Sequence, residues 1–108
     1  MSDQVNLPGV TQEQITEWKN KFGDIYLITL GDDKYIYRSL KRFEYKTLMA
    51  STESTRAFNE EKIVQMCVIY PLMDAAKIPT LKAGTITTMV ELIMAASNFG
   101  VVEEPVKL

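Results

Sequence analysis

The stretch from Asp24 to Arg38 constrains the fold most, because it predicts two β-strands joined by a tight turn. Residues 24–30 and 34–38 are rich in β-branched and aromatic side chains, which favour a pleated, half-buried strand. Between the two runs, Gly31-Asp32-Asp33 is a turn signal. The stretch therefore predicts a two-stranded antiparallel β-hairpin.

A helix is predicted directly before this hairpin. Thr11 and Gln14 have the spacing of a capping box, and Gly23 fits the position just past a helix end. The apolar face of this helix comprises Ile15, Trp18 and Phe22. Because an isolated hairpin is only marginally stable in water, we expect this helix to cover one face of it.

Three further helices are predicted after the hairpin. The first runs over about residues 40–49 with Ser39 as its N-cap. Its apolar stripe is expected to comprise Leu40, Phe43, Thr47 and Leu48. The second starts at Asn59 and continues until Pro71 stops it. The third spans roughly residues 85–98.

The expected fold class is α+β, with an N-terminal helix, a two-stranded antiparallel β-hairpin and then three helices packed as one small domain. A length of 108 residues agrees with one domain. Residues 1–9 are expected to form a flexible N-terminal arm, 10–100 the single α+β domain, and 101–108 an extended C-terminal tail.

Charge and hydropathy exclude several classes of protein. The net charge of -2 and the pI of about 5.1 argue against a generic nucleic-acid binder, which is usually basic. The first residues lack the basic and apolar regions of a secretory signal. Apolar runs are far shorter than the roughly 20 residues that cross a bilayer. We expect a soluble intracellular protein without membrane association.

No catalytic set is evident in the sequence. The chain has no histidine, the commonest general base and metal ligand. Its single cysteine, Cys67, lies on an apolar helix face and is expected to be core. The acidic pairs 32–33, 60–61 and 103–104 fit a turn, a helix start and a tail. We therefore predict no enzymatic activity, no cofactor and no metal.

Four cations after the hairpin form the best candidate binding surface. They are Arg38, Lys41, Arg42 and Lys46, and tyrosines are interleaved with them. Such a pattern can hold phosphates and stack bases, or meet an acidic protein partner. The simpler interpretation is that the tyrosines pair across the hairpin while the cations solvate a helix face. We keep the four cations as tentative partner-binding residues and consider nucleic acid the less favoured ligand.

The order of these motifs resembles a known group of proteins. The motifs are WKNKFG at 18–23, the hairpin and following helix at 24–46, EEKIVQMCVIYP at 60–71, and the helix at 85–100 with MVELIMAASNFG. Together they are similar to small tail-assembly-chaperone or virion-associated proteins of tailed bacteriophages.

The resemblance implies a non-enzymatic viral protein that forms homo- or hetero-oligomers through protein–protein contacts. Its partners would be other phage structural proteins, and its location the host cytoplasm or the virion. No catalytic residue is carried over, because that group has none. Two alternatives remain open: a nucleic-acid-binding accessory protein that uses the four cations, and a small phage inhibitor of a host protein.

Overall fold

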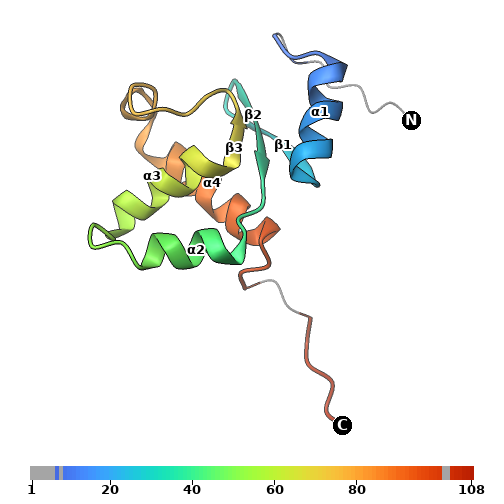
Figure 1. Ribbon diagram of the computed structural model, residues 1–108, viewed down its shortest axis with the longest axis vertical. Coiled ribbons are helices and arrows are strands. Elements are labelled where there is room, and N and C mark those ends of the chain that lie inside the picture. Colours follow the sequence, from blue (N-terminus) through green and yellow to red (C-terminus); the bar gives the residue numbers. More distant parts are fainter. Residues whose placement is uncertain (1–6, 8, 101–102) are drawn as a thin grey trace.

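Four α-helices and a three-stranded antiparallel sheet form this computed structural model, which describes residues 7, 9–100 and 103–108 (Figure 1). In chain order the elements are α1 (Gln12–Phe22), β1 (Ile25–Leu30), β2 (Asp33–Arg38), α2 (Arg42–Met49), α3 (Arg56–Cys67), β3 (Val68–Tyr70), a 3-10 helix η1 (Ile78–Thr80) and α4 (Ala83–Ala96). The predicted α+β class is confirmed, and the short strand β3 is an addition to it.

The hairpin forms as predicted and fixes the sheet's register. Gly31 has a φ of 65°, a left-handed conformation that glycine adopts without steric cost, and it starts the turn between the strands. Tyr26 of β1 lies opposite Tyr37 of β2, and the two ring centroids are 5.3 Å apart. The expected cross-strand pairing of tyrosines is therefore confirmed for this pair.

Helix α1 is also capped as predicted. The Gln14 backbone N–H donates to Thr11 Oγ1 at 3.1 Å, and the Thr11 N–H donates to Gln14 Oε1 at 2.8 Å. At the other end Gly23 has a φ of 81° and donates its N–H to Lys19. The capping box and the terminal glycine thus set both ends of α1 through local contacts.

The start of α2 differs from the prediction. The helix begins at Arg42 with Lys41, not Ser39, as its N-cap. The reason is a contact with the C-cap of α4: the Leu40 backbone N–H donates to Ser97 Oγ at 2.7 Å. This bond holds the link before Lys41 to the end of α4, and α2 starts only after it.

The second predicted helix was placed wrongly at both ends. Helix α3 begins at Arg56 because Thr55 is its cap, accepting the Phe58 N–H at 3.2 Å. It ends at Cys67, and the next three residues form β3 instead of a further helical turn. Two β-branched residues favour an extended chain there, and β2 offers an edge on which β3 pairs.

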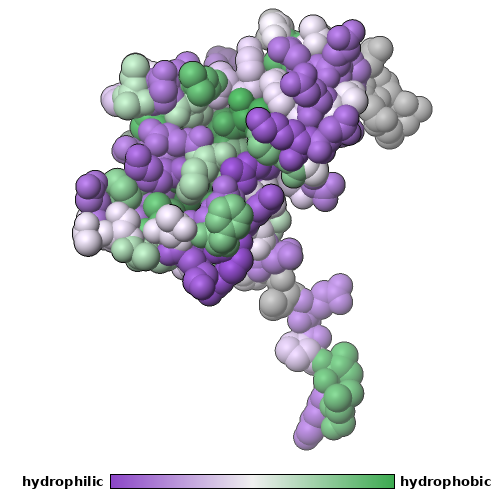
Figure 2. Space-filling model, in the orientation of Figure 1, coloured by the Kyte–Doolittle hydropathy of each residue, from purple (hydrophilic) through white to green (hydrophobic). Residues whose placement is uncertain are grey.

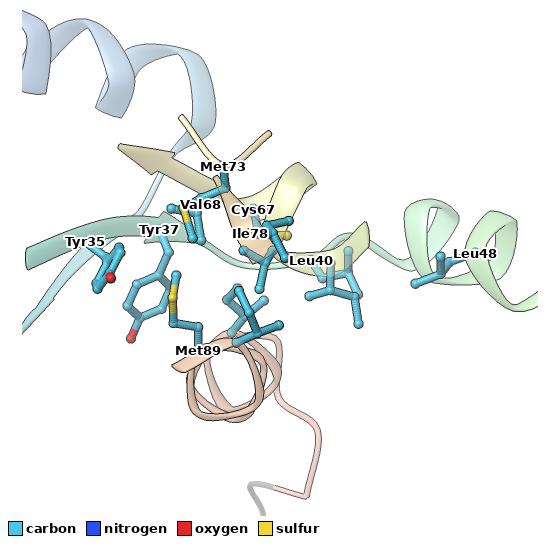
Figure 3. Packing of buried hydrophobic residues seen from close by; sticks show 13 residues of the cluster. Tyr35, Tyr37, Leu40, Leu48, Cys67, Val68, Met73, Ile78 and Met89 are labelled. Carbon is cyan, nitrogen blue, oxygen red and sulfur yellow. The ribbon is translucent and has the colours of Figure 1, made fainter. Parts of the chain in front are cut away.

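Alternate residues of β2 face two different layers. The main core lies between the sheet and the helices α2 to α4 (Figure 3). Its buried residues are Tyr35, Tyr37, Leu40, Leu48, Ile63, Val64, Cys67, Val68, Met73, Ile78, Ile86, Met89 and Ile93. In Figure 3, Tyr37 of β2 reaches toward Met89 of α4. Ile93 of α4 is fully buried in this core.

Helix α1 lies on the other face of the sheet. Ile36 of β2 is buried but is not part of the main core, and so is Ile15 of α1. Trp18 stacks on Tyr70, which lies opposite Ile36 in the register, with ring centroids 6.3 Å apart. As expected, α1 covers one face of the hairpin, and β2 is consequently buried on both faces.

The C-terminal segment 103–108 extends away from the rest of the structure (Figure 1), and each of its residues is exposed. Most of the predicted N-terminal arm falls outside the described residues; within it, the Leu7 side chain is buried. Across the part of the chain described here, no helix is both long enough and apolar enough to cross a membrane.

Candidate functional site

The four predicted cations separate into one partly buried residue and three exposed ones. Arg38 is partly buried, with 12% of its side chain exposed. Its two terminal nitrogens each donate to a Glu44 carboxylate oxygen at 2.9 Å. They also donate to the carbonyl oxygens of Ser39 at 3.0 Å and Met66 at 2.9 Å. The expectation that Arg38 is exposed for a partner is wrong, because Glu44 and the two carbonyls already hold its guanidinium.

The Arg38–Glu44 pair joins three elements of the fold. Arg38 closes β2, Glu44 is in the first turn of α2, and the Met66 carbonyl is near the end of α3. A cation at a helix C-terminus also complements the helix dipole. The hydrogen bond from Arg38 lowers the pKa of Glu44, as does the Lys41 backbone N–H, which donates to the same carboxylate at 3.0 Å. The pair therefore has a structural role.

This pair makes stability sensitive to acid. The pKa of Glu44 is lowered in the folded protein from its ordinary value of 4.5. The ionised carboxylate therefore stabilises the fold above this pKa, and the stabilisation is lost as the pH falls through the pKa of the folded protein. We expect Glu44→Gln to be less stable than wild type at about pH 7. As the pH falls from about 7 to about 3, the variant should lose less of its free energy of unfolding than wild type does. Urea unfolding across this range measures the effect.

The matched control for the acid experiment is Glu53, an exposed carboxylate in the loop before α3. Glu53→Gln should keep the wild-type dependence on pH. If Glu44→Gln instead lost stability as steeply as wild type, the Arg38–Glu44 pair would not be a source of the acid sensitivity.

The other three predicted residues, Lys41, Arg42 and Lys46, are exposed on α2 and its cap; we call them the α2 cations. The Arg42 guanidinium lies over the Tyr45 ring, 5.5 Å from its centroid. Among the described residues neither Lys41 nor Lys46 has an ion pair. Their proposed role in partner binding stays a prediction.

An apolar groove lies beside these cations, between α2 and α3. Its volume is about 380 Å³. It is lined by Phe43, Glu44, Thr47, Leu48, Ser51, Phe58, Lys62 and Met66. We call it the α2–α3 groove.

The exposed aromatic of this groove is Phe43, whose predicted burial is wrong: it is 66% exposed. Leu40 lies before α2 in the extended link, so a stripe counted from it at helical spacing does not describe one face of the helix. Leu40 and Leu48 reach the core, whereas Phe43 and Thr47 remain exposed. In the sequence, Phe43 stands alone among charged residues, and the second wall of the groove comes from α3, a separate helix. The sequence therefore does not indicate the groove.

Polar groups around the groove already have partners. The Thr47 hydroxyl donates to the Phe43 carbonyl at 2.8 Å, and Glu44 is bound by Arg38. Lys62 lies over the Phe58 ring, 5.5 Å from its centroid. With the Thr47 hydroxyl and the Glu44 carboxylate satisfied, the groove can bind an apolar side chain by burial. The exposed phenylalanine is the kind of residue that dominates such interfaces.

A second hollow lies between the hairpin turn and the start of α4, with a volume of about 690 Å³. Asp32, Asp33 and Lys82 line it together with two leucines, two glycines, three threonines and a tyrosine. Its charges are mixed in sign, and it is more polar than the α2–α3 groove. It brings together none of the predicted binding cations.

Cys67 is a core residue, as predicted. It is fully buried, and burial raises the pKa of its thiol to about 11. At neutral pH the thiol is therefore protonated and a poor nucleophile. In the described part of the chain, no three or more histidine, cysteine, aspartate or glutamate side chains are grouped as a metal site would require.

Comparisons with known proteins do not assign these features to a family. Neither a protein-family model, nor a curated protein sequence, nor a solved structure matches this chain.

Proposed function

We propose that this chain is a non-enzymatic bacteriophage assembly or virion protein, similar to a tail-assembly chaperone, that binds other phage structural proteins. Two observations support the proposal. The first is the resemblance of the motifs between residues 18 and 100 to that group of proteins. The second, which carries most weight, is the solvent-open α2–α3 groove with Phe43 two-thirds exposed at its edge.

The proposed mechanism is insertion of an apolar segment of the partner into the α2–α3 groove. Burial of Phe43 would supply affinity, because aromatic anchors in a desolvated pocket dominate binding energy. The α2 cations on the same helix would meet acidic residues of the partner. Such charges act mainly on encounter rate and register, so we expect the groove to set affinity and the cations to set orientation.

The experiment is capture of phage structural proteins by the purified chain. Phe43→Ser should weaken binding by roughly tenfold or more, because it removes an aromatic anchor. The matched control is Leu72→Ser, since Leu72 is 75% exposed and lies outside the groove. Isothermal titration with each captured protein gives the two dissociation constants. Equal affinity for wild type and Phe43→Ser, or capture of no phage structural protein, would contradict the proposal.

The burial of Arg38 works against the nucleic-acid alternative. It takes one of the four predicted cations largely out of contact with solvent, so that within this set the α2 cations remain to meet phosphates. Tyr35 and Tyr37 are in the core and cannot stack on bases. An inhibitor of a host protein would use the same groove, so the identity of the captured protein, phage or host, distinguishes it.

A further inference from the structure

The segment 103–108 presents apolar side chains to water. Val106 is 83% exposed and Leu108 is fully exposed. Figure 2 shows the apolar end of this segment standing clear of the rest of the surface. Among the described residues, no hydrogen bond or ion pair involves the segment. It is therefore free to bind elsewhere.

The sequence of this segment, Glu-Glu-Pro-Val-Lys-Leu, favours an extended shape and begins with two carboxylates. The residue before a proline is restricted to extended conformations, so Glu104 and Pro105 hold the chain extended before it binds. In an extended chain Val106 and Leu108 are on the same side, about 6–7 Å apart. The segment is thus a short apolar edge that follows two carboxylates, and its ordering on binding costs little entropy.

The α2–α3 groove has the complementary arrangement. Its walls include the rings of Phe43 and Phe58 and the Met66 side chain. Lys62 lines the groove on the α3 side. Lys46 follows Phe43 by three residues on α2, a spacing that makes the two side chains neighbours. Both lysines are exposed, so cations flank the apolar walls.

We propose that segment 103–108 of one copy of this chain docks in the α2–α3 groove of a second copy. Val106 and Leu108 enter the groove, while Glu103 and Glu104 lie beside its flanking lysines. The occupant is a second copy because the segment extends away from the body that carries its own groove (Figure 1). This inference goes beyond the proposed function and does not depend on it.

The geometry of such an interface is head-to-tail. Each copy offers one segment and one groove, so a docked copy still has a free groove or a free segment. Heterologous contacts of this kind build rings if the rotation closes and open chains if it does not. The expected product is a series of oligomers that grows with protein concentration.

Sedimentation velocity of the full chain over a wide concentration range tests the proposal. Wild type should associate, and the double variant V106S/L108S should associate at least about tenfold more weakly, as should Phe43→Ser. Leu72→Ser is the control and should associate like wild type. An equimolar mixture of V106S/L108S with Phe43→Ser should form a one-to-one dimer, because one variant keeps an intact groove and the other an intact segment.

A charge exchange tests the flanking contacts. E103K/E104K should weaken association, and adding K46E/K62E in the same chain should restore it. Two results would overturn the proposal: a wild-type chain that stays monomeric at every concentration, or oligomers that persist unchanged in V106S/L108S. Capture of phage structural proteins by V106S/L108S is a separate measurement, so loss of self-association and loss of the proposed function are told apart.

Discussion

Replacing Arg38 with alanine should lower the free energy of unfolding by about 2 kcal/mol, within the range for losing hydrogen bonds to a charged group. The variant leaves the Glu44 carboxylate, only 15% exposed, without its cationic partner. It also removes donors from the carbonyls of Ser39 and Met66. Three elements lose their common contact at once. Urea unfolding at pH 7 measures the change.

The matched control for Arg38→Ala is Arg42→Ala, which removes an exposed arginine from the same part of the chain. It should change stability by less than about 0.5 kcal/mol. The double variant R38A/E44A should recover part of the loss, because no unpaired carboxylate remains. If Arg38→Ala cost no more than Arg42→Ala, the pair would have no structural role.

Shortening Ile93 to alanine should cost about 3 kcal/mol, the middle of the range for deleting buried aliphatic carbons. Ile93 is fully buried in α4 and belongs to the main core. Its removal leaves a cavity between α4 and the elements packed on it, since a close-packed interior relaxes only in part. Thermal or urea unfolding of the variant gives the loss directly.

Thr88→Ala is the control for this core variant, because Thr88 lies on the same helix with an exposed side chain. Alanine is the better helix former, so stability should stay within about 0.5 kcal/mol of wild type. A loss below 1 kcal/mol for Ile93→Ala (small against the roughly 2–5 kcal/mol of such truncations) would place Ile93 outside the tightly packed core.

The parts of the fold that depend on neighbouring residues could be predicted from the sequence. The capping box of Thr11 with Gln14, the turn at Gly31 and the alternation of Tyr35 with Ile36 each involve contacts over a few positions. Such contacts select one local geometry. They define α1 and the hairpin with its register.

The elements placed wrongly depend on partners far away in the chain. The short strand β3 leaves the helical pattern because β2 provides an edge. The start of α2 is displaced by Ser97 of the chain beyond α4. The helical pattern of the sequence runs through both places, and a tertiary contact ends it in each.

The candidate site could be predicted only in part, for the same reason. The exposure of the α2 cations could be predicted, because charge on a helix surface is visible in sequence; their role in binding stays a prediction. The groove was missed because Phe43 and Phe58 line it from different helices. The sequence alone favours an exposed Arg38, because its partners, Glu44 and the Met66 carbonyl, are brought to it only by folding.

The position of α1 on the far face of the sheet has a consequence for the order of folding. The ring on which Trp18 stacks belongs to Tyr70, a residue of β3. That strand joins the sheet only after the loop containing α2 and α3 has closed, and closing a long loop costs entropy before its contacts form. Helix α1 precedes both strands of the hairpin in the chain, yet we expect it to be among the last of the described elements to complete its docking surface.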